Sequence, residues 1–281
     1  RSIGHAKKAI KKFNPDIVVG FGGYPSASAV QAAFGLKIKT MIHEQNSIIG
    51  LTNKILIKKV DQIVCCYQKA YQEFPKEKTL LLGNPRASVI VHEQPKDVYD
   101  EYHLDRQKKV VTIVMGSLGS QTVNQTMKEC MDQFKGKDYQ VVYVSGKPYY
   151  ESMKAYENEN VHIVPYVNDM PSLMHITDLI VSRAGASTLA ELTALGVPAI
   201  LIPSPYVSAN HQEYNARELE NNHAAKMILE KDLTGEKLIS TIDSVINDQT
   251  ALQILTESAK KLGKPNAVED MYQEIISMLG D

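Results

Sequence analysis

One segment near the middle of the chain combines two strand-like runs, a glycine turn and a helix-like stretch with no linker between them. The runs Asp178–Val181 and Val197–Pro203 are short and apolar, as buried strands are. Between them, Leu189, Leu192 and Leu195 recur at a spacing of three residues, which is typical of a helix face packed on a sheet. Two strands joined through a helix lie parallel in one sheet, so the segment predicts a βαβ unit.

The same alternation extends over nearly the whole chain. The expected strands are 16–21, 38–43, 62–66, 79–82, 110–115, 140–144, 161–164, 178–181, 198–202 and 224–228. The expected helices include 4–13, 26–35, 50–59, 68–74, a short helix near 97–103, and a helical tail over 234–280 that breaks at Pro265. Repeated βαβ units form parallel sheets through right-handed crossovers. We therefore expect an α/β protein of two Rossmann-like domains facing a cleft.

The glycine turn has the composition of an anion-binding helix start. Gly185 lets the backbone approach a ligand, and the new helix presents free N–H groups there. Ser187 and Thr188 add hydroxyl donors, and Glu191 can accept hydrogen bonds from two sugar hydroxyls. These groups suit a nucleotide sugar. They also suit a plain N-cap with Glu191 as its capping-box partner, and the segment alone leaves both interpretations open.

Polar or glycine-rich clusters follow several other expected strands. They are Gly20–Ser26, His43–Ser47, Gly83–Arg86 and Gly116–Ser120. Ligands of open α/β sheets bind beyond the carboxyl ends of the strands, so these clusters are candidate binding loops.

Composition disfavours several classes of site. Of three cysteines, Cys65 and Cys66 are adjacent on a strand-like run and Cys130 lies in a helix-like one, which suits neither a disulfide framework nor a zinc site. The chain has no Asp-x-Asp, and its eight histidines show no ligand spacing, so we expect no metal and no cofactor. No apolar run approaches the roughly 18 residues of a transmembrane helix.

The net charge of −1 conceals an uneven distribution. Residues 1–90 carry fourteen basic and five acidic side chains, a net charge of +9, whereas residues 91–281 carry seventeen and twenty-seven, a net charge of −10. An anionic membrane surface is the favoured partner for the basic part, because each nearby basic residue contributes about 1 kcal/mol there. Nucleic acid is disfavoured, since aromatic residues are not interleaved with the lysines. A solvated face without function is the other alternative. The clustered lysines are Lys7, Lys8, Lys11, Lys12, Lys54, Lys58 and Lys59.

Three motifs occur in an order that resembles one known family. They are His43–Asn46, Arg183–Glu191 and Asn210–Ala216, and the resemblance extends from Asp16 to Met278. The chain is similar to the lipid II-forming glycosyltransferases of bacterial cell-wall synthesis, the MurG family. The resemblance implies an inverting N-acetylglucosaminyltransferase that uses UDP-N-acetylglucosamine and the lipid undecaprenyl-diphospho-muramoylpentapeptide. It also implies a peripheral location on the cytoplasmic face of the cell membrane.

The resemblance assigns substrate-binding roles to individual residues. Ser117 matches the serine of the glycine-rich loop, Val167 the position that holds the uracil through backbone groups, and Gln212 the residue that reads the sugar hydroxyls. Asn46 matches an asparagine at the donor sugar. Arg86 matches the arginine of a Gly-Asn-Pro motif, although the family pattern places one more residue between proline and arginine. The matching nucleotide-binding helix start comprises Gly185, Ala186, Ser187, Thr188, Leu189, Ala190 and Glu191.

The resemblance also divides the chain by role. Residues 1–90, joined by a C-terminal helix 266–281, are expected to form the acceptor and membrane-side domain, and residues 105–262 the donor-binding domain. The family carries a further N-terminal strand and a glycine-rich loop ending in the usual general-base histidine, so we expect the first domain to be incomplete. No catalytic base is assigned, because His43 and Glu44 are better suited to orienting loops.

Two other functions are retained as alternatives. A UDP-N-acetylglucosamine 2-epimerase has a similar two-domain layout, but the basic N-terminal part and the segment His43–Asn46 argue against it. The second alternative is a truncated chain that binds the UDP-sugar without turnover.

Overall fold

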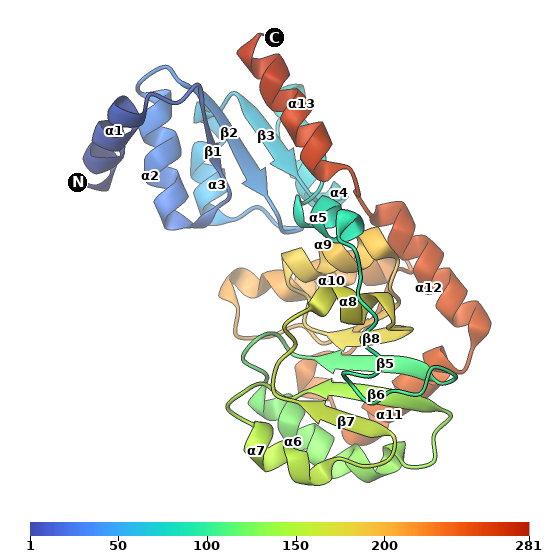
Figure 1. Ribbon diagram of the computed structural model, residues 1–281. Coiled ribbons are helices and arrows are strands. Elements are labelled where there is room, and N and C mark those ends of the chain that lie inside the picture. Colours follow the sequence, from blue (N-terminus) through green and yellow to red (C-terminus); the bar gives the residue numbers. More distant parts are fainter. Residues whose placement is uncertain (281) are drawn as a thin grey trace. The chain divides into compact units, whose positions relative to one another are not determined.

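A computed structural model describes residues 1–280 and divides the chain into two compact units. Unit 1 comprises Arg1–Ser88 and Lys264–Asp281, and unit 2 comprises Val89–Gly263. Each unit is built on a parallel sheet, which confirms the α/β class with two Rossmann-like sheets. The two units are shown in Figure 1.

Unit 1 contains a four-stranded parallel sheet in the order β1-β2-β3-β4. Its strands are β1 (Ile17–Gly20), β2 (Lys39–Glu44), β3 (Gln62–Cys65) and β4 (Thr79–Leu81). Its helices are α1 (Ser2–Phe13), α2 (Gly23–Phe34), α3 (Leu51–Leu56), α4 (Gln68–Glu73) and α13 (Ala267–Leu279), while α5 (Arg86–His92) contains the boundary with unit 2. The expected helix 266–281 corresponds to α13, and Asp281 lies outside the described residues.

The pleat of the unit 1 sheet separates two small cores. Ile42 and Ile63 face Val30 of α2, whereas Met41 and Val64 on the alternate positions face Met271 of α13. Successive side chains of a strand point to opposite faces, so α2 and α13 cover opposite faces of the sheet. Figure 1 shows both helices beside β1–β3, with α1 packed outside α2.

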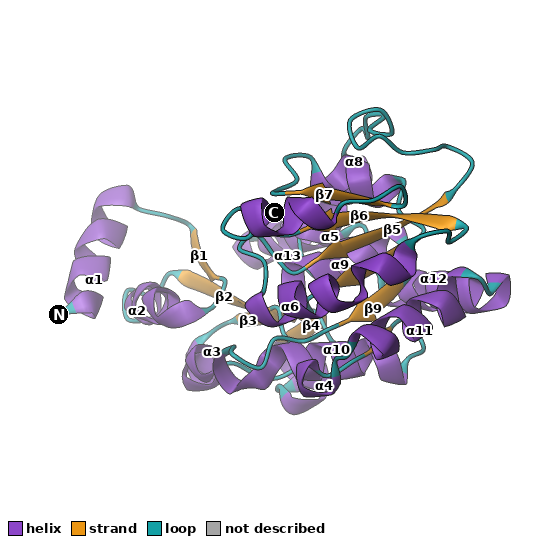
Figure 2. Cartoon of the chain, turned by 90° about the horizontal axis from the view of Figure 1, so that it is seen from below, coloured by secondary structure: helices purple, strands orange, loops and turns teal. Residues whose placement is uncertain are grey.

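Unit 2 contains a six-stranded parallel sheet in the order β10-β9-β8-β5-β6-β7. Its strands are β5 (Lys109–Val114), β6 (Tyr139–Val144), β7 (Val161–Val164), β8 (Leu179–Ser182), β9 (Ala199–Leu201) and β10 (Lys226–Met227). Its helices are α6 (Gln121–Cys130), α7 (Tyr150–Met153), α8 (Met170–His175), α9 (Ala186–Leu195), α10 (His211–Asn221), α11 (Gly235–Ile246) and α12 (Gln249–Leu262). Figure 2 shows these strands between helical layers.

The order of strands in unit 2 creates a topological switch point. The chain proceeds from β5 outward through β6 and β7, and then returns to the other side of β5 to form β8, β9 and β10. The loops that leave β5 and β8 therefore diverge to opposite sides of the sheet, with α6 on one face and α9 on the other (Figure 1). A crevice opens at such a point beyond the carboxyl ends of the two strands.

Two expected helices differ from the structure. The short helix near 97–103 is wrong: these residues form turns, because the Asp97 carboxylate accepts the Tyr99 N–H at 3.1 Å and competes with helical bonding. The helical tail 234–280 breaks at Pro265 as expected, but it also breaks before Gln249. There Asp248 caps a new helix by accepting the N–H groups of Thr250 and Ala251.

Candidate functional site

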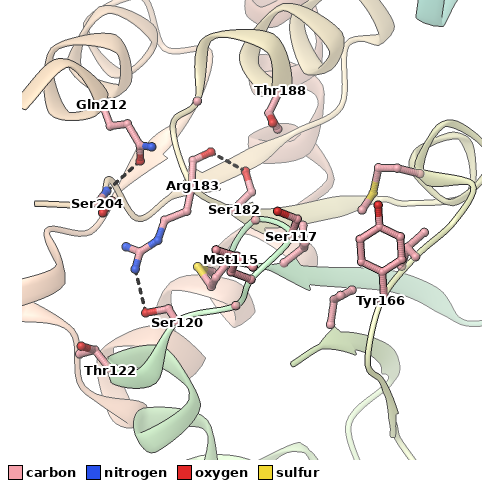
Figure 3. A pocket seen from close by; sticks show the side chains of 18 of the residues that line it. Met115, Ser117, Ser120, Thr122, Tyr166, Ser182, Arg183, Thr188, Ser204 and Gln212 are labelled. Atoms are coloured by element: carbon pink, nitrogen blue, oxygen red, sulfur yellow. Dashed lines mark hydrogen bonds between the residues drawn. The ribbon is translucent and has the colours of Figure 1, made fainter. Parts of the chain in front are cut away.

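A cavity of about 710 Å³ lies at the switch point of unit 2. The loop after β5 and the start of α9 form much of its wall, and residues near α8 and α10 complete it (Figure 3). Six of the expected substrate-binding residues line this one cavity: Ser117, Val167, Gly185, Thr188, Glu191 and Gln212. Residues from four separate segments of the chain thus meet where the sheet topology places a ligand site.

The loop after β5 is held against the loop after β6 by close backbone contact. Gly119 has a positive φ of 72°, and a Cβ atom on it would lie 2.3 Å from the carbonyl oxygen of Ser145. A Cβ atom on Gly146, the facing residue, would lie 2.6 Å from the carbonyl oxygen of Leu118. Any side chain at either position would separate the loops. Sequence analysis singled out Gly119 but missed Gly146.

Asn124 ties the same two loops together from below. Its Nδ2 donates to the carbonyl oxygen of Ser120 at 2.8 Å and to that of Ser145 at 3.1 Å. The side chain is buried, so both bonds are sheltered from water. Sequence analysis missed Asn124. Its position beside Val123 and Met127, on the apolar face of an amphipathic helix, could have indicated a buried asparagine that needs hydrogen-bond partners.

The start of α9 presents uncapped backbone donors to the cavity. Gly185 is the N-cap residue and has no side chain to bond the first N–H groups of the helix. A Cβ atom there would meet nothing closer than Thr188 Oγ1 at 4.0 Å, so the backbone is open to a close ligand. Glu191 lies six residues after the N-cap, which is too far for a capping-box partner. The capping alternative is therefore wrong for Glu191.

The expected nucleotide-binding helix start is divided between two faces of α9. Thr188 and Glu191 line the cavity, and the Glu191 side chain is buried. Leu189 instead packs in the interior, and the exposed Ser187 does not line the cavity. Ala186 and Ala190 likewise lie outside its lining. These residues remain candidates through their backbone groups alone.

Arg183 connects the loops after β5, β8 and β9. Its guanidinium donates through Nη2 to Ser120 Oγ at 2.8 Å (Figure 3). It also donates through Nη1 to the carbonyl oxygen of Ile202 at 3.0 Å. Arg183 was recognised as part of a motif but not as a site residue. Its partners lie 63 and 19 residues away in the chain, so no local pattern reveals them.

Gln212 and the loop before α10 close one side of the cavity. The side-chain oxygen Oε1 of Gln212 accepts the N–H of Ser204 at 2.9 Å, which directs the amide Nε2 away from that bond (Figure 3). Ala209 and Asn210 immediately before α10 both have a φ of 53°. Left-handed backbone at a non-glycine residue costs free energy and occurs often at ligand sites.

A separate polar cluster lies at the carboxyl end of β2 in unit 1. The buried carboxylate of Glu44 accepts the N–H groups of Asn46 at 3.0 Å and Gly50 at 2.8 Å. It also accepts Nδ2 of Asn53 at 2.8 Å. Glu44 therefore shapes the loop that carries Asn46, and this agrees with a loop-orienting role rather than that of a base.

His43 is also a structural side chain. It is buried, and its Nε2 lies 2.9 Å from the carbonyl oxygen of Gly83, to which it donates. Burial lowers the pKa of His43 below its ordinary value, despite that hydrogen bond and the nearby Glu44. His43 is therefore a neutral imidazole, and it joins β2 to the segment Gly83–Arg86. Arg86 follows in this segment, exposed at the start of α5, with its N–H bonded to Asn84 Oδ1 at 3.0 Å.

Residues 1–280 contain neither a metal-binding cluster nor a membrane-spanning helix. No group of three or more His, Cys, Asp or Glu side chains within this range is placed to hold a metal ion. None of the helices in this range combines the length and apolar character that a membrane span requires.

Sequence comparison identifies relatives of nearly the whole chain. The profile of the Glycosyltransferase family 28 C-terminal domain matches residues 110–271, and that of the Glycosyltransferase family 28 N-terminal domain matches residues 1–65. A protein of Listeria monocytogenes serotype 4a (strain HCC23) is 44% identical over 279 residues, 98% of this chain and 77% of that protein. Its name is UDP-N-acetylglucosamine--N-acetylmuramyl-(pentapeptide) pyrophosphoryl-undecaprenol N-acetylglucosamine transferase. A Bacillus cereus (strain ATCC 14579) transferase of the same name, numbered 1, is 45% identical over 97% of this chain and 76% of its own length.

Solved structures share the fold. The crystal structure of Acinetobacter baumannii MurG has a TM-score of 0.81 at 25% sequence identity and covers 98% of this chain and 78% of its own. A putative UDP-N-acetylglucosamine 2-epimerase from Listeria monocytogenes has a TM-score of 0.78 at 13% identity, covering 99% of this chain and 78% of its own. The second likeness is one of fold alone.

Proposed function

The chain belongs to glycosyltransferase family 28, and we propose that it transfers N-acetylglucosamine from UDP-N-acetylglucosamine to the muramoyl unit of undecaprenyl-diphospho-muramoylpentapeptide. This converts lipid I into lipid II in peptidoglycan synthesis. The observation that carries the proposal is the 44% and 45% identity, over nearly the whole chain, to transferases named for this reaction. The cavity at the switch point of unit 2 supports the proposal, because six residues that match donor-binding positions of the family line it.

The reaction sets three tasks for the protein. The bond between the anomeric carbon and the β-phosphate oxygen breaks, a bond from that carbon to the acceptor hydroxyl oxygen forms, and the hydroxyl proton is released. The leaving UDP gains negative charge, which backbone N–H groups at a helix N-terminus stabilise. We assign this role to the first turn of α9, which has no side-chain cap, and to the loop at Ser117, which lines the same cavity.

The other donor contacts follow from the cavity lining. Glu191 accepts hydrogen bonds from the ribose hydroxyls, and Val167 holds the uracil through its backbone. Gln212 uses its Nε2 to read the sugar hydroxyls, since its Oε1 is engaged by Ser204. The amides of Ala186, Ser187, Thr188, Leu189 and Ala190 complete the nucleotide-binding helix start. In unit 1, Asn46 and Arg86 are proposed to contact the donor sugar and the substrate phosphates.

The membrane face belongs to unit 1. Helix α1 carries four lysines and no acidic residue, and the same unit exposes large apolar side chains. Phe13 is 82% exposed and Leu51 is 76% exposed. Basic and apolar side chains together favour an anionic lipid surface, which is where the lipid acceptor resides. We place the protein as a peripheral enzyme on the cytoplasmic face of the bacterial cell membrane, without a nucleic-acid partner.

Product analysis separates this proposal from its alternatives. The chain is incubated with UDP-N-acetylglucosamine labelled in the sugar, with and without the lipid acceptor. We expect the label to enter the lipid fraction, with one UDP released for each sugar transferred, and no change of the donor when the lipid is omitted. An epimerised donor without lipid would support the 2-epimerase. Binding with no product in either case would support the chain that binds the UDP-sugar without turnover.

A further inference from the structure

The cation nearest the proposed donor site is engaged by a buried carboxylate. Among the described residues that line the cavity, Arg183 is the one basic side chain. Its Nη2 lies 2.5 Å from Oε2 of Glu230, and the two side chains are only 13% and 5% exposed. Among the described residues Oε2 of Glu230 has no hydrogen-bond partner, and its negative charge is balanced by the ion pair with Arg183.

Both residues of the Arg183–Glu230 ion pair are carried by segments that follow strands of the sheet. Glu230 follows β10 in the short helical turn Glu230–Asp232, and Arg183 follows β8. The remaining guanidinium contacts, to Ser120 and Ile202, fasten the same side chain to two further loops. The guanidinium is therefore not free to turn onto a phosphate, and its charge is balanced before any ligand enters.

Charge balance at this position has a direct consequence for an anionic ligand. Two opposite charges 2.5 Å apart act at longer range as a dipole, whose field falls off faster than that of a single charge. Buried charges are poorly screened, so removal of one partner leaves a strong net field in the cavity. Glu230 thus controls how strongly Arg183 attracts a diphosphate, although Glu230 itself lies outside the cavity lining.

We propose that Glu230 is a positioning residue that holds Arg183 on Ser120 and withholds its charge from the nucleotide diphosphate. The diphosphate is then bound chiefly by backbone N–H groups, and the product UDP is held less tightly than by an unpaired arginine. This inference rests on the proposed function, because it takes the cavity to bind a UDP-sugar.

The test compares UDP with uridine, which lacks the diphosphate, by calorimetry at pH 8. Glu230→Gln leaves Arg183 unbalanced, and we expect the ratio of UDP to uridine affinity to rise by about three- to tenfold. Arg183→Met leaves Glu230 unbalanced, and the ratio should fall. The double variant restores neutrality, so adding Glu230→Gln to Arg183→Met should raise UDP affinity again. Glu230→Asp, which keeps the charge, should retain a ratio near that of the original chain.

The outcomes separate the possible roles. If Glu230 only supports the fold, both ligands weaken in parallel, and the double variant is no better than Arg183→Met. Either result would overturn the proposal. Melting curves for every variant identify those that fold. If Glu230→Gln alone does not fold, the comparison of Arg183→Met with the double variant, which leaves no unpaired charge, still decides the question. Failure of the original chain to bind UDP would instead count against the proposed function itself.

Discussion

The hydroxyl of Tyr143 donates a hydrogen bond to Oδ1 of Asn124 over 2.7 Å, and both side chains are buried in unit 2. Burial raises the pKa of Tyr143, so the phenol remains a protonated donor at neutral pH. The bond orients the Asn124 amide so that its Nδ2 reaches the carbonyl groups of Ser120 and Ser145. One tyrosine deep in the sheet thus fixes two loops at the donor cavity.

Tyr143→Phe removes that hydroxyl and leaves Asn124 Oδ1 without its donor. An unsatisfied buried acceptor costs about 1–3 kcal/mol. For a unit of this size we expect the melting temperature to fall by roughly 2–10 °C, with weaker UDP binding because the loops are less well held. Tyr156→Phe, at an exposed tyrosine of the same unit, is the control and should change neither quantity. An unaltered melting temperature in Tyr143→Phe would show that the bond does not stabilise the site.

Glu191→Ala removes the carboxylate assigned to the ribose. Hydrogen bonds to a charged group contribute about 1.5–3 kcal/mol, so nucleotide affinity should fall by that amount. UMP and the UDP-sugar should weaken alike, since both contain the ribose, and calorimetric titration measures each. Glu236→Ala, an exposed carboxylate on α11, is the matched control. Affinity within twofold of the original chain would remove Glu191 from the ligand contacts.

The stability of the protein should depend on His43 below neutral pH. In the folded chain, burial holds the pKa of His43 below 6.5, which is its ordinary value in an unfolded chain. At a pH between the folded and the unfolded pKa, the unfolded chain therefore binds a proton that the folded chain does not. Stability is therefore full above pH 6.5 and is lost as pH falls, by at most about 1.4 kcal/mol per pH unit for each such histidine. Burial also lowers the pKa of His162, which adds in the same direction.

Urea unfolding followed by circular dichroism between pH 5 and 8 measures this dependence. His43→Gln should reduce the loss of stability on acidification, whereas His5→Gln, at an exposed position, should leave it as it was. An equal pH dependence in His43→Gln and the original chain would mean that His43 is not the group that titrates.

Replacing Lys7, Lys8, Lys11 and Lys12 by Gln should weaken binding to anionic vesicles. Each basic residue near such a surface contributes about 1 kcal/mol, so the total loss is several kcal/mol at most. Binding should also rise with anionic lipid content and fall with added salt, which screens charge over about 8 Å at physiological strength. The UDP-sugar affinity should not change. Cosedimentation with vesicles measures the effect.

The control for this experiment changes the same number of charges in unit 2. Its exposed lysines Lys108, Lys226, Lys237 and Lys261 are replaced by Gln. Equal losses in the two variants would indicate an effect of net charge alone, and equal sedimentation with neutral and anionic vesicles would leave the α1 lysines as an ordinary solvated face.

The features that follow from local pattern were predictable. Short apolar runs alternating with helical periodicity predicted the parallel sheets, and the clusters beyond them predicted binding loops at Ser117 and Gly185, which line one cavity. Gln212 was predicted from the family resemblance, and it lines the same cavity. A strand and the loop after it are adjacent in the chain, so a local sequence pattern is enough to recognise both. The position of a ligand site at the ends of parallel strands then follows from topology.

The contacts that fasten these loops were not predictable in the same way. Gly119 against Gly146, Asn124 against Ser145 and Arg183 against Glu230 join residues that are 21 to 47 positions apart. Each depends on the order of the strands across the sheet, which local pattern does not specify. The predicted helix at 97–103 was wrong for the opposite reason. There a purely local hydrogen bond, from the Tyr99 N–H to the Asp97 carboxylate, competes with helical bonding.

A crystal structure of the chain grown with UDP-N-acetylglucosamine in the presence of EDTA tests the central claim most directly. We predict density for the nucleotide in the cavity of unit 2, with the diphosphate on the N–H groups at the start of α9, the ribose on Glu191 and no metal ion. Arg183 should keep its contact with Ser120 in this complex. A nucleotide bound elsewhere, or one seen only when a divalent metal is supplied, would contradict the account.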